Sequence, residues 1–348
     1  MDFRFSDEQE MMADVARGLL ADLCQPTHLR QLLAAGTPRD AARWQALKDL
    51  GLQGIMVPEA AGGLGLQAID FVKIAEAAGY AALPEPLVEN AGVALPFLAA
   101  VAPDSPLLAA ALDGEITLAL AHPATPFVAD ADTAGAVLQV SDHSITAAAP
   151  GDLTLTRQES ADPFRRIFTV SGEGAVLATR AAAQTALDLA LDHGALFAAA
   201  QLLGLAQRAV DLAVAYAQER QQFGKPIGAY QAIKHHLATA QVGIEFARPV
   251  LYAAAAGVAA QDLLSRARVS QAKIACAEAA DLATRTSVQV HGAMGYSSEV
   301  DVHFFLKRTI ALTGAWGHQG LHRARVATRV FAGPTGPAST FAREVQNG

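Results

Sequence analysis

The sequence predicts a mainly α-helical protein with a small β-domain in the middle of the chain. Alanine is abundant, 52% of the residues are hydrophobic and only 17% are charged, which favours closely packed helices over a sheet-dominated fold. Apolar residues recur at helical spacing toward both ends of the chain, and short β-type runs lie between them. At 348 residues the chain is long enough for two or three domains. We expect a helical domain over residues 1–113, a β-domain over 114–174 and a helical bundle over 175–348.

The N-terminal region is expected to be helical. Ser6 precedes several acids, and a capping hydroxyl followed by an acidic first turn is typical of a helix start. Helical periodicity continues to about Leu33, resumes from Asp40 to Leu50 and returns from Ala68 to Ala78. A glycine cluster lies before the last of these segments, with no strand leading into it and no Lys-Ser/Thr pair after it. We therefore interpret the cluster as a packed turn rather than a phosphate loop; it consists of Gly62, Gly63 and Gly65.

The residue pattern of the sequence changes from helical to β-type after about Gly114. Five short β-type runs, separated by Asp, Pro, Gly and Ser clusters, predict a small β-domain up to about Gly174. These runs are ITLALA, GAVLQV, ITAAA, LTLTR and RRIFTV. From roughly Ala175 onward the pattern is helical again, with long alanine-rich segments. Pro249 interrupts one of them and is expected to kink or restart the helix.

The charge balance and the cysteine content narrow the class of protein. A formal charge of −8 argues against a nucleic-acid binder, which would need a basic face. We expect no signal peptide, because Met1 to Glu10 carries four acids and no apolar core. The longest apolar stretches, such as Ala195 to Ala206, are too short to span a bilayer. Cys24 and Cys276 are far apart and form no metal spacing, which is typical of reduced core thiols in a cytoplasmic protein.

One stretch, Gly204 to Gln231, combines a helical stripe with a group of side chains that can bind phosphate. Its apolar residues recur at helical spacing, and we expect the helix to end with Gly224 as a left-handed cap before Pro226. Just before that stop stand an arginine, two glutamines and Phe223. A guanidinium pairs with phosphate while an aromatic ring packs on an apolar surface. The alternative from the residues alone is an ordinary amphipathic helix end with a solvated arginine.

The same stretch, written YAQERQQFGKPIGAYQAI, strongly resembles the signature of acyl-CoA dehydrogenases, flavoenzymes that introduce a double bond next to a thioester carbonyl. A second segment, Gln289 to Tyr296, resembles the QVHGGxGY motif of that family, with Ala293 in place of one glycine. PEAAGGLG and AEAAGYAALPEPLVENAGVALPFL are similar to its N-terminal helical domain. The order helical, β, helical is also the family's layout. The resemblance therefore covers essentially the whole chain and implies an acyl-CoA dehydrogenase-like fold.

The resemblance implies FAD as the cofactor. In the family, residues of both motifs reach the FAD of a neighbouring subunit, and glycines let the backbone approach the pyrophosphate. The matching positions, which are our candidate FAD contacts, are Arg220, Gln222, Phe223, Tyr230, Gln231, Gln289, Val290, His291, Gly292 and Ala293. Without the family, Gly292 and Gly295 would form a helix-ending loop, and His291 would be a satisfied loop residue.

Two other family features are missing from the sequence. The family binds the flavin ring with a TEPxAGSD-like loop in the β-domain, whereas the stretch from Leu118 to Gly135 has Pro123 and Thr125 but no Glu-Pro pair and no Gly-Ser-Asp. The β-domain is also shorter than is usual in the family. We therefore expect the chain to lack its own cradle for a flavin ring.

The second missing feature is the catalytic base. Most members have a glutamate before a glycine about twenty residues past the GY motif, where this chain has Trp316, and an indole accepts no proton. A smaller branch carries its glutamate where this chain has Gly194. Asp192 and His318 are nearby in sequence and are the candidates for a relocated base.

The pattern resembles the short, non-catalytic subunit of heteromeric acyl-CoA dehydrogenases from actinobacterial steroid side-chain degradation. The resemblance implies an α2β2 heterotetramer in which a full-length paralogue supplies the base and the ring cradle, an acyl-CoA is the substrate and an electron-transfer acceptor takes the electrons. One alternative is a self-sufficient homo-oligomeric dehydrogenase with a relocated base. Another is a non-enzymic scaffold of the same fold, or a nucleic-acid-binding relative, although the acidic balance opposes the latter.

Overall fold

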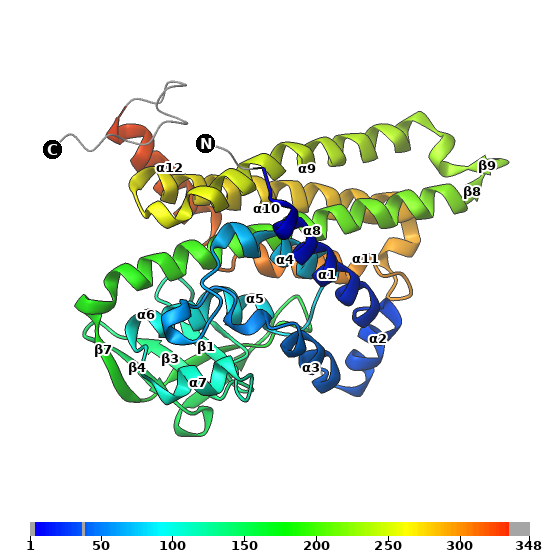
Figure 1. Ribbon diagram of the computed structural model, residues 1–348. Helices are drawn as coiled ribbons and strands as arrows, with labels where there is room; N and C mark the ends of the chain where they lie inside the picture. Colours follow the sequence, from blue (N-terminus) through cyan, green and yellow to red (C-terminus); the bar gives the residue numbers. More distant parts are fainter. Residues whose placement is uncertain (1–3, 37–38, 334–348) are drawn as a thin grey trace.

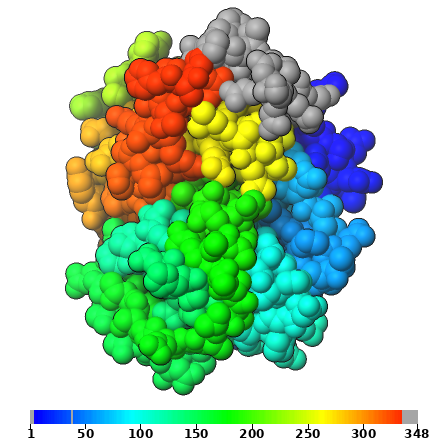
Figure 2. All heavy atoms as spheres, turned by 90° about the vertical axis from the view of Figure 1, so that its left-hand side faces the viewer, coloured from blue at the N-terminus to red at the C-terminus, as the bar shows by residue number. Residues whose placement is uncertain are grey.

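The computed structural model describes residues 4–36 and 39–333, so Met1 to Phe3 and the last fifteen residues of the expected third domain lie outside the described part. The chain is mostly helical with sheets in the middle, as the sequence predicts (Figure 1). Seen from the side, the sheets and the start of a long helix form the lower half of the molecule, and the C-terminal helices form the upper half (Figure 2).

The N-terminal region consists of helices and tight turns. Ser6 caps the first helix through a reciprocal pair of hydrogen bonds with Gln9, which confirms the predicted helix start. The helix breaks at Cys24, earlier than the periodicity indicates, because Pro26 begins a second helix. The helices are α1 (Asp7–Leu23), α2 (Pro26–Ala35), α3 (Ala41–Asp49), α4 (Ala68–Tyr80), α5 (Leu87–Glu89), a π-helical turn (Asn90–Ala94), α6 (Leu95–Val101) and α7 (Pro106–Leu112).

The glycine cluster is the packed turn that the sequence predicts. Gly62 and Gly65 have φ of +88° and +65°, a region that favours glycine. A Cβ on Gly63 would lie 2.1 Å from the carbonyl oxygen of Val57. The cluster therefore closes a tight connection before α4.

The middle region contains two small sheets. The first has the strand order β1-β3-β4-β7 and the second β2-β6-β5. The last strand, β7, pairs with β4 and lies just past the boundary expected at Gly174, because β-branched residues such as Val176 and Thr179 suit a strand. The strands are β1 (Leu118–Ala121), β2 (Val128–Ala129), β3 (Ala136–Val140), β4 (Ser144–Ala148), β5 (Thr154–Gln158), β6 (Ile167–Ser171) and β7 (Ala175–Thr179).

The C-terminal region is a bundle of long helices built around α8. Helix α8 contacts α4, α9, α10 and α11, and most of its central residues are buried. Helix α9 continues through Pro249, so the helix does not restart there. The helices are α8 (Arg180–Glu219), α9 (Gln231–Gly257), α10 (Leu263–His291), α11 (Val302–Thr313) and α12 (Gln319–Ala332).

The signature stretch ends differently from the sequence expectation. Helix α8 stops at Glu219, and the chain then forms a hairpin of β8 (Gln221–Gln222) and β9 (Lys225–Pro226). Phe223 and Gly224 occupy the turn with φ of +52° and +79°. Two left-handed residues between paired strands make a tight hairpin turn, so Gly224 serves this turn instead of capping α8.

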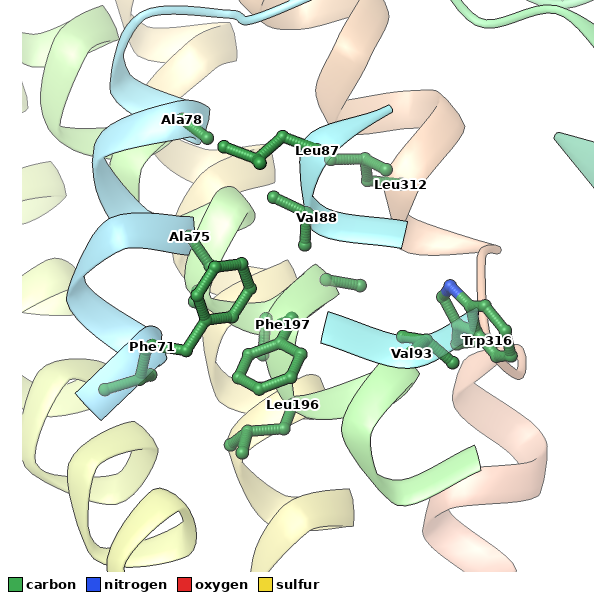
Figure 3. Packing of buried hydrophobic residues seen from close by; sticks show 14 of the residues in the cluster. Phe71, Ala75, Ala78, Leu87, Val88, Val93, Leu196, Phe197, Leu312 and Trp316 are labelled. Atoms are coloured by element: carbon green, nitrogen blue, oxygen red, sulfur yellow. The ribbon is translucent and has the colours of Figure 1, made fainter. Parts of the chain in front are cut away.

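Close helix packing brings the N-terminal and C-terminal regions into one core. A Cβ on Gly79 of α4 would lie 2.1 Å from the Gln201 carbonyl oxygen of α8, and one on Gly204 of α8 would lie 2.0 Å from the Glu76 carbonyl oxygen of α4. Phe71 and Phe197 meet edge to face between these helices, with ring centroids 5.0 Å apart (Figure 3). Trp316 lies at the edge of the same cluster, on the side of Val93 (Figure 3).

Candidate functional site

The hairpin carries the first group of candidate residues to one end of the molecule, beyond α8 and α9 (Figure 1). Arg220 closes α8 with its backbone N–H, which donates to the Tyr216 carbonyl, and its side chain is exposed. Phe223 at the tip is 91% exposed. The Tyr230 hydroxyl donates to the Gln222 carbonyl at 3.1 Å and so braces the hairpin from the start of α9. Large exposed aromatic and cationic groups at a protruding tip are available to another molecule.

The second group lies where α10 ends. Gln289, Gly292 and Ala293 are exposed, whereas Val290 and His291 are buried. His291 is held by a 2.7 Å hydrogen bond between Nδ1 and the Ser287 carbonyl. Gly292 ends the helix with φ of +60° and ψ of −135°, and a Cβ there would meet nothing within 4 Å. The backbone at the end of α10 is therefore open to close approach from outside.

The structure brings the two sequence motifs together. The ring of Tyr216, at the end of α8, stacks on His291 with centroids 4.3 Å apart. Val290 packs with Ala213 and Ala217 of α8 and with residues at the start of α9. Val290 and His291 thus fix the relative position of the motifs, and the exposed side chains around them form one outward-facing surface. Gln231, the first residue of α9, is exposed beside them.

Trp316 is the residue that the sequence resemblance aligns with the family's glutamate. Its side chain is buried and its backbone has φ of +55°, a strained conformation for a bulky residue. A Cβ on Gly194 would lie 2.1 Å from Cδ2 of the indole. Gly194 and Trp316, the two positions that the sequence resemblance singles out for a base, therefore touch in this chain, and the indole occupies the space above Gly194.

The turn that carries Trp316 is held by polar groups that the sequence gave no reason to choose. His322 Nε2 lies 3.0 Å from the Trp316 carbonyl oxygen, and His322 Nδ1 lies 3.2 Å from Ser270 Oγ. The buried Lys273 ammonium donates to the carbonyls of Leu312 and Thr313 at the end of α11. In the sequence, Trp316 and His322 are simply six positions apart, and this spacing alone does not predict a contact between them.

The segment from Leu118 to Gly135 leaves little room beside Trp316. A cavity of about 30 Å³ lies between this segment, α5 and the indole, lined by Leu120, Thr125, Phe127 and Trp316 among others. Ligand pockets for organic molecules typically enclose 300–1,000 Å³. A cavity of about 30 Å³ holds on the order of one water molecule, so the described residues do not fit a flavin ring here.

The two candidates for a relocated base are occupied elsewhere. The Asp192 carboxylate is buried and pairs with Arg325 and, at 3.8 Å, with Arg266. Burial raises the pKa of Asp192, and the two guanidinium groups oppose that rise. His318 is exposed and caps α12, with Nδ1 accepting from the Leu321 backbone N–H at 3.3 Å. Both side chains therefore already have partners within this chain.

The fold and both motifs identify the class of this protein. Residues 6–101 match the N-terminal domain of acyl-CoA dehydrogenases and residues 184–331 match their C-terminal domain. The chain belongs to the acyl-CoA dehydrogenase family, whose members are FAD-dependent oxidoreductases.

Several known proteins resemble this chain in sequence or in fold. The chain is 30% identical over 310 residues to acyl-CoA dehydrogenase IpdE2 of Mycobacterium tuberculosis, a match that covers 87% of this chain and 91% of that relative. Its fold matches the ChsE4–ChsE5 complex of M. tuberculosis with a TM-score of 0.82 and 23% identity, over 96% of this chain and 100% of the other. It also matches a Tcur3481–Tcur3483 steroid ACAD, with a TM-score of 0.78 and 21% identity over 94% of this chain and 98% of the other.

Helices α8 and α9 are long and apolar enough to cross a membrane by length and composition alone. A core helix passes the same test, and 89% of the apolar window of α8 is buried within the fold. The length and composition of these helices are therefore weak evidence for a membrane segment.

Proposed function

We propose that this chain is the non-catalytic subunit of a heteromeric, FAD-dependent acyl-CoA dehydrogenase, which removes hydrogen from the α and β carbons of an acyl-CoA thioester. A full-length paralogue supplies the catalytic base and the flavin-ring cradle, and an electron-transfer acceptor reoxidises the flavin. This chain supplies contacts to the dinucleotide part of the paralogue's FAD.

The proposal rests on the difference between two parts of the site: the residues proposed to contact a neighbour's cofactor are exposed, whereas the region around Trp316 is packed. The residues that would serve a neighbour's cofactor are exposed around one surface, with Arg220 and Phe223 on the hairpin and Gln289 at the end of α10. Trp316 occupies the space above Gly194 and lines a cavity of only about 30 Å³, which supports the view that this chain holds no flavin ring or substrate of its own. A subunit that completes another chain's site needs the first surface and has no use for the second.

Each exposed group has a chemical role in this arrangement. The Arg220 guanidinium pairs with phosphate oxygens, and the amides of Gln222, Gln231 and Gln289 donate to or accept from polar atoms of the dinucleotide. The open backbone at Gly292 and Ala293 lets a phosphate approach closely. Bound FAD would supply the acceptor for the hydride that leaves the β carbon.

The substrate class is proposed from similarity alone. One solved structure with this fold is described as a steroid ACAD, and the relative IpdE2 is an acyl-CoA dehydrogenase. We infer that the substrate is a CoA thioester of the steroid side-chain type, handled in the cytoplasm. The heteromeric form is supported by the ChsE4–ChsE5 complex, one chain of which this protein matches over that chain's full length.

Co-expression with a full-length paralogue tests the proposal. The co-purified complex should contain FAD and bleach it when an acyl-CoA is added, whereas the isolated chain should bind FAD weakly and turn over no substrate. Stoichiometric FAD together with turnover by the pure single chain would instead support a self-sufficient dehydrogenase. The partner can be identified among adjacent genes by co-purification.

A further inference from the structure

A cavity of about 600 Å³ lies between α3 and the segments that lead into β1 and β3. Ligand pockets for organic molecules typically enclose 300–1,000 Å³, so this cavity has the size of a ligand site. None of the proposed FAD contacts lines it, since those residues are on the hairpin and at the end of α10. It is also separate from the cavity of about 30 Å³ beside Trp316, with which it shares Pro86.

Lys48 of α3 brings a fixed positive charge into the wall of this cavity. Its Nζ donates to the Gly114 carbonyl at 3.2 Å, which uses one of the three donors of an ammonium. Gly114 has φ of +69°, and a Cβ there would lie 2.2 Å from Cδ of Lys48, so the lysine stem packs directly on the glycine. Arg39 also lines the cavity, but its guanidinium pairs with Asp130. Lys48, by contrast, makes no ion pair with any residue that the structure describes, so its charge is available to a ligand.

Trp44 supplies an aromatic wall beside that charge. It precedes Lys48 by four residues on α3, so the two side chains lie on the same side of the helix. The indole is half-buried: part of it packs against the hydrophobic core, and part of it lines the cavity. An aromatic face next to an ammonium complements a flat apolar ring that carries an anionic group.

The acids in the wall do not cancel this preference for an anion. Asp40 pairs with His28 at 2.9 Å and also caps α3, and Glu85 pairs with the buried Arg43 at 3.1 Å. Glu115, the third acid, is exposed, so water weakens its effect. A metal ion is a less suitable occupant, because the described residues contain no group of three His, Cys, Asp or Glu side chains that could hold one.

We propose that this cavity binds a small organic anion with a flat apolar body, namely an aromatic or fused-ring carboxylate. The carboxylate accepts hydrogen bonds from Nζ of Lys48, and the ring lies against Trp44. Ile116 and Ala134 complete the apolar part of the wall. This inference goes beyond the proposed function, because the site is separate from the FAD contacts and needs no partner chain.

Fluorine NMR of the full-length chain labelled with 5-fluorotryptophan tests the proposal, with 2-naphthoate as the probe. The chain contains two tryptophans, so two resonances are expected, and Trp44→Phe assigns them. 2-Naphthoate should shift the Trp44 resonance saturably and leave the Trp316 resonance unchanged. The neutral 2-naphthamide has the same ring and should bind at least roughly fivefold more weakly, because a carboxylate is a stronger partner for an ammonium than an amide carbonyl is.

Lys48→Met removes the charge and keeps the side-chain stem that packs on Gly114. This variant should weaken 2-naphthoate on the order of tenfold and remove most of the difference between the two probes. Lys307→Met is the matched control: Lys307 is an exposed lysine on α11 outside the cavity, and its replacement should change neither affinity.

Three results would overturn the proposal: no saturable shift of the Trp44 resonance, equal binding of the two probes by the unmodified chain, or a preference for the anion that survives Lys48→Met. A shift of the Trp316 resonance alone would also overturn it, because the probe would then occupy the cavity beside Trp316. The comparison of the two probes on the unmodified chain requires no variant to fold. None of these measurements involves flavin or the paralogue, so the proposed function is tested separately.

Discussion

At position 194, α8 has no room for a side chain, because the indole of Trp316 lies where a Cβ would be. The backbone of Trp316 has φ of +55°, and its carbonyl oxygen is hydrogen-bonded to His322. A strained residue persists only where its surroundings determine its conformation. The small residue and the large one therefore form a single packing unit, and each should depend on the other.

This dependence predicts a non-additive pair of variants. Gly194→Ala should destabilise the chain by about 1–3 kcal/mol through overpacking, and Trp316→Ala by about 3–5 kcal/mol through the cavity that it leaves. In the double variant the new methyl enters the vacated space, so its own cost should largely disappear. Urea unfolding of the four proteins measures this. Gly18→Ala is the control, because a Cβ there meets nothing within 4 Å and should be neutral or stabilising; additive costs would mean that the two residues do not share one space.

Arg220 makes no ion pair among the described residues, so its charge is available to a ligand. Arg220→Ala should leave the stability of the isolated chain unchanged and remove flavin from the co-expressed complex, at a cost on the order of 2–5 kcal/mol if the charge pair is desolvated. Flavin per complex, measured by absorbance after gel filtration, is the readout. Arg157→Ala, an exposed arginine on β5, serves as the control. Normal flavin content in a well-assembled Arg220→Ala complex would make the guanidinium a simple surface group.

At the scale of elements, the hairpin between α8 and α9 replaces the helix end that the sequence predicts. The apolar stripe of α8 continues up to Phe223, but Pro226 and Gly224 favour a turn, and two backbone pairs between β8 and β9 are enough to close it. Phe223 keeps a left-handed conformation that asparagine or glycine would adopt at lower cost. Phenylalanine is unfavourable in this conformation and is exposed at the tip, which indicates that its side chain contacts another molecule.

Phe223→Asn tests that idea. Asparagine tolerates φ of +52° better than phenylalanine, so hydrogen exchange in the hairpin should stay the same or slow slightly, by less than about 1 kcal/mol of local stability. Flavin retention in the complex should fall, because the aromatic contact is lost. If flavin content is unchanged while the hairpin becomes more stable, the phenylalanine has no role in cofactor binding.

The sequence was most informative about elements with strong local signals and least informative about contacts between distant residues. The cap at Ser6, the glycine turn and the order of helical and β regions follow from local chemistry, and the structure confirms them. Helix α9 runs through Pro249 because packing against α8 and α10 outweighs one lost hydrogen bond. The contact of Gly194 with Trp316 joins residues more than a hundred positions apart, and no periodicity predicts it.

At the scale of the whole molecule, several histidines are buried in the neutral form. Burial lowers the pKa of His122, His193 and His322 to about 4. His122 uses both nitrogens, since Nε2 faces the Leu187 carbonyl and Nδ1 accepts from the Ala124 backbone N–H, so a second proton would break a hydrogen bond. The unfolded chain binds protons at these sites near pH 6.5, and the folded chain does not.

Stability should therefore be fully present above about pH 6.5 and should fall as the pH decreases toward 4. At pH 5 each of these histidines should cost on the order of 2 kcal/mol relative to pH 7.5. Asp130 opposes this trend in part, because burial raises the pKa of its carboxyl to about 6 and protonation then favours the folded form. The urea midpoint at pH 7.5 and at pH 5 measures the balance, and an equal or higher midpoint at pH 5 would contradict neutral burial of the histidines.

The division of roles between two chains gives the last prediction. If only the base were missing, Trp316→Glu would restore it at the position that the family uses. The cavity beside Trp316 is about 30 Å³, however, and the segment from Leu118 to Gly135 lacks the groups that hold a flavin ring. Trp316→Glu should therefore give no turnover in the isolated chain, while replacing the matching glutamate of the paralogue by glutamine should abolish turnover and leave FAD bound. Acyl-CoA-dependent flavin bleaching in each complex is the measurement, with Trp316→Gln as the uncharged control. Turnover by isolated Trp316→Glu would show that this chain can hold a flavin ring by itself. The assignment of roles would be reversed if Trp316→Ala in this chain stopped turnover of the complex while the paralogue's glutamate proved dispensable.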